Sequence, residues 1–332
     1  QADRAFFAFA RFFTALSSGV SLLSMFKQTP DRLRQLISLM NRSDFVAEML
    51  ADKPAILDAR VSPEFLYIDA SRRSIEYKED ICGAADFEDA LNAARRRVRE
   101  DHFRIITAIL TARITPIRAA ELLTEVADSV VKAMLPVAIK EVARIAEPVR
   151  GEVAVLGLGK MGGREMRLLS DLDIMLIYRP ADGEENAQRL YTKVTQRLVS
   201  ALSAVTEEGG LYDVDMALRP SGRSGPVAVT VNAFASYYAG KAWTWEYMAL
   251  SRARIVAASS KAFITDLEPV VKSALTAPRP DLNMPAHIGD MLRRTKAEKP
   301  PKNAWQVKSV DGGLRDIEFI AQSLFLTNRD AF

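Results

Sequence analysis

The chain has 332 residues, which is long enough for two or three domains because single apolar cores rarely grow beyond roughly 250–300 residues. Apolar residues make up 48% of it and charged residues 26%, the composition of an ordinary globular protein. With 45 basic and 42 acidic residues the net charge is only +3, so the charge total indicates neither a nucleic-acid partner nor an anionic membrane.

The single cysteine, Cys82, excludes an intrachain disulfide framework and a thiolate metal cluster, and it fits a reducing cytoplasm. No apolar run reaches the ~18–20 residues of a membrane span. The N-terminal run ADRAFFAFARFFTALSSGVSLL is broken by charged and small polar residues, and it is predicted to be a buried helix. Since the sequence begins at Gln1 and stops at Phe332 within a helical pattern, we expect a piece of a longer chain.

Residues 1–117 are predicted to form an N-terminal helical domain. Thr29-Pro30-Asp31 and Ser62-Pro63 each place a capping hydroxyl before a proline at the first helical position. The basic run ARRRVRE, residues 94–100, invites a nucleic-acid interpretation, but on an amphipathic helix it more often forms a solvated face, which is the expectation here.

Residues 118–262 are predicted to form a second domain, in which the spacing of apolar residues changes from that of a helix to that of strands. A helix from Thr115-Pro116 to about Ala146, kinked at Pro136, precedes short apolar runs that are typical of buried strands. A proline-rich loop and a final helix from about Leu314 belong to residues 263–332, the expected start of a C-terminal helical domain. In chain order the central elements are a strand at 153–158, a strand at 172–178, a helix at 184–207 and a strand at 211–218.

The segment GLGKMGGREMRLLSDLD, residues 157–173, admits two incompatible interpretations. Its G-x-G-x-x-G spacing is that of a dinucleotide-binding turn, but such a fold needs a full crossover helix before the next strand. Only residues 164–170 are available, which is barely two turns. An ATPase phosphate loop also fails, because Met161 follows Lys160 where serine or threonine should hold the metal.

The carboxylates favour the second interpretation. Asp171 and Asp173 stand two apart at a strand start, so both point to the same side of the sheet. Charges ~6 Å apart repel by about 3 kcal/mol at an effective dielectric near 20, so either one carboxyl keeps a proton or a cation lies between them. Asp215 joins them if its strand is a neighbour. Three such oxygen ligands suit Mg²⁺ on a polyphosphate, although an isolated D-x-D is more often a turn or cap feature.

The surrounding residues are candidates for binding the phosphates. Gly162 and Gly163 let the backbone approach a phosphate, with the N-terminus of a short following helix beside it, and Ser170 offers a hydroxyl. Lys160 and Arg219 are candidates for charge neutralisation. The alternatives are a solvated turn lysine at 160 and a loop anchor at 219.

Three further groups are not placed in the catalytic set. Trp243, Trp245 and Glu246 could line a substrate surface, but aromatic residues at i and i+2 more often pack. His102 and His287 have no partners at ligand spacing, so neither suggests zinc or a catalytic dyad.

Four long motifs carry a resemblance to a known family: VLGLGKMGGREMRLLSDLDIMLIY, YDVDMALRPSGRSGP, WTWEYMALSRARIV and DGGLRDIEFIAQ. Together with GVSLLSMFKQTPDRLRQLISLM near the N-terminus, they resemble the glutamine synthetase adenylyltransferase family of bacterial nitrogen control. The last motif is also similar to a helical segment of the uridylyltransferase of the PII signalling protein. The resemblance covers most of the chain.

The resemblance implies an α+β fold, with a small sheet domain of the nucleotidyltransferase (polymerase-β-like) type flanked by helical domains. It implies transfer of AMP from ATP to a tyrosine of glutamine synthetase, with PII as a further partner. The two-metal acids of the family map onto Asp171, Asp173 and Asp215, which implies Mg²⁺. Ala217 departs from the pattern, where the family usually carries an arginine.

Family members have two related halves, one attaching AMP and one removing it by phosphorolysis. The segments WTWE and LRPSGRSG look more like the attaching, C-terminal half. Two alternatives stay open: the removing half, which would release ADP, and a regulatory module that senses glutamine or docks PII. Metal-dependent ATP binding would argue against the module.

Overall fold

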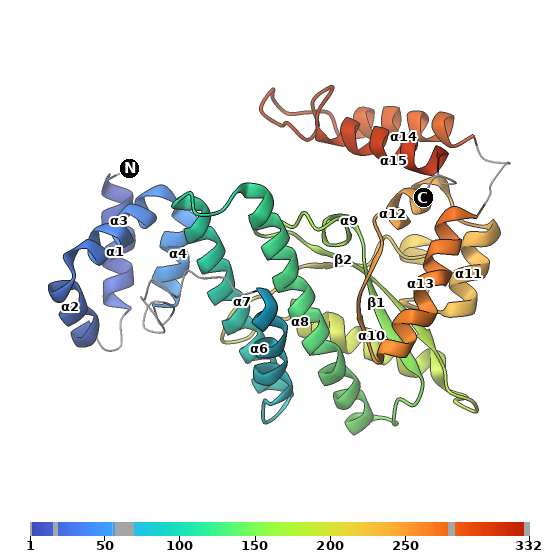
Figure 1. Ribbon diagram of the computed structural model, residues 1–332, viewed down its shortest axis with the longest axis horizontal. Coiled ribbons are helices and arrows are strands. Elements are labelled where there is room, and N and C mark those ends of the chain that lie inside the picture. The colour runs from blue at the N-terminus through green and yellow to red at the C-terminus, as the bar shows by residue number, and fades with distance from the viewer. Residues whose placement is uncertain (1, 16–18, 55, 57–69, 278–282, 329–332) are drawn as a thin grey trace. The chain divides into compact units, whose positions relative to one another are not determined.

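The computed structural model describes residues 2–15, 19–54, 56, 70–277 and 283–328. They fold into two compact units (Figure 1), and the long helix α8 (Pro116–Ile145) runs from the first into the second. The first unit comprises residues 1–130, 165–168 and 205–211, and the second comprises residues 131–164, 169–204 and 212–332. Among the described helices, none combines the length and the apolar character needed to cross a bilayer.

The described part of residues 1–117 consists mainly of helices, whereas the domain boundaries after residues 117 and 262 stay a prediction. Three of its helices begin with side-chain caps. Ser43 accepts a hydrogen bond from Val46 N–H, Asp86 accepts one from Asp89 N–H, and Thr115 accepts one from Arg118 N–H. One helix begins at Pro30 as predicted, but the Thr29 hydroxyl makes no cap bond; Ser62-Pro63 lies outside the described residues. The helices are α1 (Ala2–Thr14), α2 (Gly19–Gln28), α3 (Pro30–Arg42), α4 (Asp44–Asp52), α6 (Ala70–Cys82), α7 (Phe87–Leu110) and the first half of α8.

The predicted solvated face at residues 94–100 of α7 is wrong. Arg95 is buried, and its guanidinium donates to the carbonyl oxygens of Leu91 and Gly209. Arg99 donates to the carboxylate of Glu208 at 3.0 Å. A run of arginines is solvated only where nothing faces it, and here the turn at residues 205–211 supplies carbonyl and carboxylate acceptors.

The second unit is built on a mixed five-stranded sheet. Strands β1 (Glu152–Gly157) and β2 (Leu172–Arg179) pair antiparallel, with Gly157 opposite Ile174. This pairing excludes the dinucleotide-binding fold, whose first two strands are parallel. Strand β5 (Arg254–Ala258) continues the sheet beside β1, while β3 (Val214–Asp215) and β4 (Ala228–Thr230) both pair parallel with β2.

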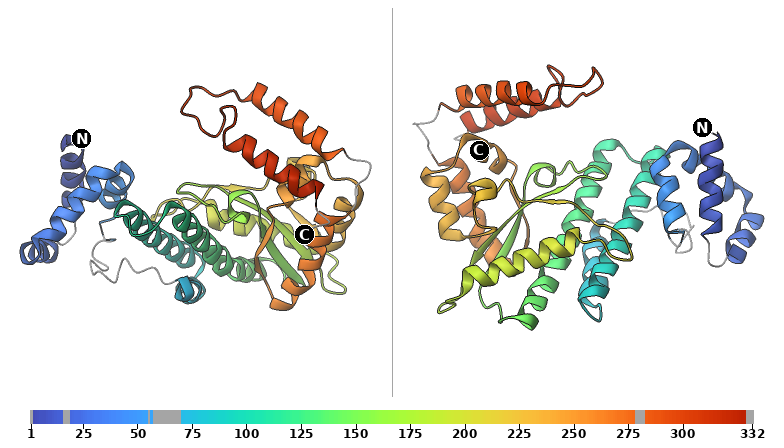
Figure 2. Two further views of the ribbon diagram at one scale, coloured as in Figure 1. Left: turned by 45° about the horizontal axis from the view of Figure 1, so that its top comes forward. Right: turned by 180° about the vertical axis from the view of Figure 1, so that it is seen from behind.

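Helices cover both faces of this sheet. Leu156 and Met175 point into a core with Phe234 and Phe263, which come from α11 (Val231–Gly240) and α13 (Lys261–Thr276). On the other face the ring of Tyr178 stacks on that of Tyr191 in α10 (Ala187–Ser203), with 4.2 Å between centroids. In Figure 1 α13 lies in front of the sheet, and the view from behind in Figure 2 brings α10 to the front. The sheet is therefore buried on both sides, as its apolar strands predict.

Several predicted elements differ in length or place. The strand predicted at residues 211–218 is only two residues long, because the Asp215 carboxylate accepts the Ala217 N–H and turns the chain. The helix predicted at residues 184–207 is α10, which is shorter at both ends. The helix expected after Gly163 does not form; the single turn α9 (Gly159–Gly162) precedes that residue. Strands β4 and β5 were not predicted, since three and five residues leave little periodicity.

A pair of helices ends the described chain. They are α14 (Met284–Glu298) and α15 (Leu314–Thr327), which begins where the sequence predicts it. Met284, Ile288 and Leu326 from this pair are buried in the same core as α12 (Thr244–Leu250). The predicted helix at residues 115–146 also forms, and α8 continues through Pro136.

Candidate functional site

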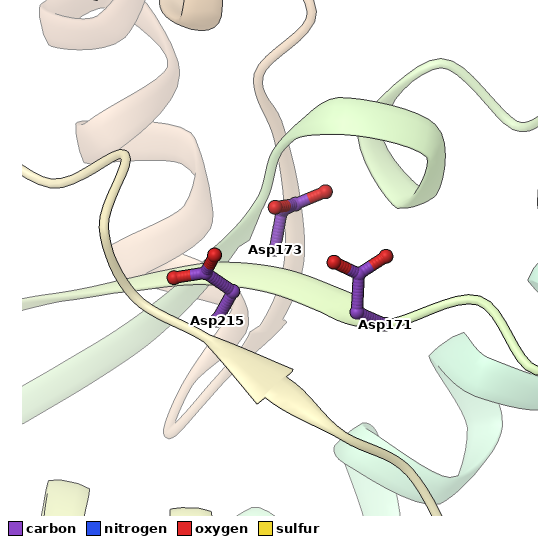
Figure 3. Close-up of side chains that lie close together, drawn as sticks. All are labelled: Asp171, Asp173 and Asp215. Carbon is purple, nitrogen blue, oxygen red and sulfur yellow. The ribbon is translucent and has the colours of Figure 1, made fainter. Parts of the chain in front are cut away.

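Three carboxylates gather at the edge of the sheet where β2 begins. Asp171 and Asp173 flank the first residue of β2, and Asp215 ends β3. Asp173 and Asp215 are register partners of the two parallel strands, so the pairing itself places them side by side. One carboxylate oxygen from each residue lies within 4.8 Å of the others, and Figure 3 shows all three side chains on the same side of the strands. The clustering expected from the sequence is therefore present.

A lysine and a backbone amide orient this cluster. The Lys160 ammonium donates to Asp171 Oδ1 at 3.2 Å, so Lys160 is not the freely solvated turn lysine of the alternative interpretation. The Ala217 N–H donates to Asp215 Oδ1 at 2.7 Å. Each contact fixes one carboxylate. The Asp171 side chain nevertheless keeps 43% of its surface exposed.

Electrostatics single out Asp173 among the three acids. Burial and the neighbouring charge of Asp171 raise the pKa of Asp173 from 3.8 to about 6, with Asp215 adding to the effect. The positive charges of Lys160 and Lys308 act in the opposite direction. In the metal-free protein the Asp173 carboxyl therefore keeps its proton to a higher pH than an ordinary aspartate does. This is the retained proton that the sequence analysis gave as the alternative to a bound cation.

The glycine turn between β1 and β2 shapes the space around Asp173. A Cβ built on Gly159 would lie 2.0 Å from Asp173 Oδ2, and the residue has a positive φ of 49°. A Cβ on Gly162 would lie 1.9 Å from the Arg252 carbonyl oxygen. These glycines therefore make room for a carboxylate and for a neighbouring segment. Sequence reasoning used Gly159 only as part of a nucleotide fingerprint and missed its role beside Asp173.

The other candidate residues lie in different surroundings. Gly163 caps α9 in a right-handed conformation, and Ser170 is buried directly before Asp171. Arg219 is also buried, and its guanidinium donates to four carbonyl oxygens of its own loop, those of Met216, Arg223, Gly225 and Pro226. This is the loop anchor of the alternative interpretation. Phosphate contacts by any of these residues remain a prediction.

Glu246 is held within the fold. Its fully buried carboxylate accepts hydrogen bonds from Trp243 N–H, Ser221 N–H and the Tyr237 hydroxyl at 2.8–2.9 Å. These contacts cap α12 and tie it to the loop that follows Asp215. Trp243 is 70% exposed, whereas Trp245 lies near Gly222 of that loop.

The raised pKa of Asp173 predicts a gain in stability when its charge is removed. A carboxyl with a higher pKa in the folded state favours folding when protonated, and that contribution is lost as the pH rises through about 6. We expect Asp173→Asn to raise the free energy of unfolding of the metal-free protein by about 1–2 kcal/mol at pH 7, after allowance for solvent screening, and by much less at pH 4. Chemical denaturation in EDTA at both pH values measures this, and a variant less stable than the parent at pH 7 would contradict it.

Comparisons with known proteins identify the family of the chain. A family model described as glutamate-ammonia ligase adenylyltransferase matches residues 33–268, more than half of the chain. A protein of Caulobacter vibrioides is 39% identical over 336 residues, covering 99% of this chain and 34% of that protein. A protein of Agrobacterium fabrum is 37% identical over 340 residues, covering 98% of this chain and 34% of that protein.

Both relatives are named bifunctional glutamine synthetase adenylyltransferase/adenylyl-removing enzyme. The chain spans about a third of their length. Its motifs, its α+β fold and these matches agree, and the chain belongs to the glutamate-ammonia ligase adenylyltransferase family.

Proposed function

We propose that this chain transfers AMP from ATP to a tyrosine hydroxyl of glutamine synthetase and releases pyrophosphate. The observation that carries the proposal is the cluster of Asp171, Asp173 and Asp215 on two paired strands. The names of the relatives, which include adenylyltransferase activity on glutamine synthetase, support it. The WTWE and LRPSGRSG segments favour the transferring half. On the resemblance alone, we also propose PII as a partner and the cytoplasm as the place of action.

The donor set fits Mg²⁺. Hard oxygen ligands are those that this ion prefers, and the three carboxylates bring one oxygen each within 4.8 Å of the others. Asp171 and Asp173 would hold the ion on the triphosphate, and all three acids would hold the ion near the attacking hydroxyl. When bound, the ions would neutralise phosphate charge and lower the pKa of the attacking hydroxyl.

The residues of the chain then have distinct roles in the transfer. The tyrosine oxygen attacks the α-phosphorus in line, the bond from the α-phosphorus to the bridging oxygen breaks, and pyrophosphate leaves. Asp215 accepts the phenolic proton, since the Ala217 N–H holds its Oδ1 in place. Lys160, already beside Asp171, neutralises charge on the polyphosphate. Gly162, Gly163 and Ser170 are proposed phosphate contacts, whereas any contribution of Arg219 acts through the loop that it anchors.

The second candidate is removal of AMP from modified glutamine synthetase by phosphate, with release of ADP. It is retained because the relatives are named for both activities and the chain covers only about a third of each. The same carboxylates would serve, because both reactions displace a group at the α-phosphorus.

A labelling assay tests the proposal. The chain is incubated with α-³²P-ATP, Mg²⁺ and unmodified glutamine synthetase, and label is expected on the synthetase. If none appears, the chain is given AMP-modified synthetase and phosphate; release of ADP would replace the proposal with the removing activity. Failure of both reactions, together with no Mg²⁺-dependent binding of ATP, would contradict nucleotidyl transfer by this site.

A further inference from the structure

One buried carboxylate lies outside the acidic cluster. The Glu246 side chain, on α12, is fully buried, and it forms no ion pair with any residue that the structure describes. Burying a carboxylate is unfavourable unless hydrogen bonds or a positive charge compensate for the lost water. The groups that donate to Glu246 therefore indicate what this side chain does.

Three donors surround the Glu246 carboxylate. The Trp243 N–H donates to Oε2 at 2.8 Å and the Ser221 N–H to Oε1 at 2.9 Å, while the Tyr237 hydroxyl lies 2.9 Å from each oxygen. Capping of α12 accounts only for the first of these bonds, and a glutamine oxygen would serve it equally well. The other two donors lie outside α12, and a glutamine amide would turn its own N–H groups towards one of them. A carboxylate at this position therefore holds more than its own helix.

The segment that Glu246 holds is the middle of the loop at residues 216–226. Ser221 has a positive φ of 63°, a conformation that a residue with a side chain keeps only when surrounding contacts enforce it. Its N–H is shared between the Glu246 carboxylate and the Tyr237 hydroxyl, which lies 3.0 Å away. The loop is therefore attached to α11 and α12 through the backbone of Ser221.

The same loop fixes the residues that directly follow Asp215. One residue after the attachment point, the Gly222 N–H donates to the Arg219 carbonyl oxygen at 2.8 Å. The Arg219 guanidinium donates to the carbonyl oxygen of Met216 at 2.7 Å. The Ala217 N–H then donates to Asp215 Oδ1, also at 2.7 Å. A continuous series of contacts thus leads from the buried carboxylate to an acid of the cluster.

We propose that Glu246 is a positioning residue for Asp215. It fixes the loop at residues 216–226, and the loop fixes the carboxylate that accepts the phenolic proton in the proposed reaction. The inference rests on the proposed function, because that function gives Asp215 its part in the transfer. Glu246 takes no chemical step of its own and acts through the loop.

Steady-state AMP transfer to glutamine synthetase tests the effect on the reaction. We expect Glu246→Gln to lower kcat by about 10- to 100-fold, because the amide cannot accept all three donors and the loop shifts. The KM for ATP should change by less than about threefold, since Asp171 and Asp173 are proposed to hold the ion on the triphosphate. Tyr237→Phe, which removes one donor and leaves the carboxylate, should lower kcat by a smaller factor.

Ser260→Ala is the matched control. The Ser260 hydroxyl caps α13 by accepting the Phe263 N–H at 3.0 Å, and it donates to Glu152 at 2.6 Å. Glu152 lies opposite Arg179, at the other end of β2 from the acids. Loss of this cap lowers stability without touching the loop, so kcat should stay within about twofold of the parent.

Hydrogen exchange measures the loop without any reaction. In the metal-free protein we expect Glu246→Gln to speed exchange of the amides at residues 215–222 by about tenfold or more, with the Ala217 N–H among them. Ser260→Ala should speed exchange only at the start of α13. If Glu246→Gln does not fold, Tyr237→Phe provides both measurements.

The outcomes separate this inference from the proposed function. With an active parent chain, a folded Glu246→Gln whose kcat equals that of Ser260→Ala, or whose loop amides exchange at the parent rate, would overturn the inference alone. A loss of activity that lies wholly in the KM for ATP would also overturn it, because the defect would then be in nucleotide binding. A parent chain inactive in both the transfer and the removal assay would overturn the proposed function, and with it the role of Glu246 in the reaction.

Discussion

Replacing Asp173 with asparagine is expected to lower the rate of AMP transfer by about 10³-fold or more, equivalent to about 4 kcal/mol of transition-state stabilisation. Asp173 belongs to the cluster of three acids and lies opposite Asp215 in the register of β2 and β3. An amide offers a weaker ligand for a divalent cation and leaves the remaining carboxylates without their shared partner. The label transferred to glutamine synthetase per minute, measured at saturating ATP, gives the rate.

Asp213→Asn is the matched control. Asp213 has the same chemistry two residues before Asp215, but its side chain is exposed and lies outside the cluster, and only its carbonyl oxygen serves the sheet, accepting the Leu172 N–H. We expect its rate to stay within about twofold of the parent, as is usual for an isolated surface substitution. A folded Asp173→Asn chain that keeps more than about a tenth of the parent activity would contradict the assignment of the acids.

The acids could be predicted because their placement depends on local geometry. The period of two residues in a strand puts Asp171 and Asp173 on one side whatever the rest of the fold does. Asp215 needed one further assumption, that its strand lies beside theirs, and the parallel pairing of β2 with β3 meets it. The connection at residues 164–170 is too short for a crossover helix, which correctly predicted that β1 and β2 are not parallel; they pair antiparallel.

What could not be predicted depends on contacts between distant segments. Arg95 is buried because a turn more than a hundred residues later supplies its acceptors. Glycine is needed at position 159 because the Asp173 carboxylate occupies the space where a side chain would lie. The spacing of glycines in the sequence does not reveal this contact. The missing helix after Gly163 has a local cause, because Arg164 and Leu169 adopt positive φ angles that end any helix there.

Gly159→Ala is expected to lower AMP transfer by about 10²-fold or more while the protein stays folded. The new methyl group would lie 2.0 Å from Asp173 Oδ2, so the carboxylate must move or rotate away from the other two acids. A misplacement of about 1 Å in a catalytic group can cost about 10²-fold in rate. The substitution also carries a backbone cost of about 1 kcal/mol, because alanine disfavours a φ of 49°.

Gly183→Ala separates these two effects. Gly183 has a positive φ of 72°, but a Cβ there would meet nothing within 4 Å. It should therefore show a similar loss of stability, measured by denaturation, with transfer activity within about twofold of the parent. If Gly159→Ala and Gly183→Ala retained equal activity, Asp173 would not need the position that the glycine leaves open for it. Loss of activity in the first variant alone, at matched stability, would show that the glycine turn acts through the carboxylate, because the backbone cost is common to both.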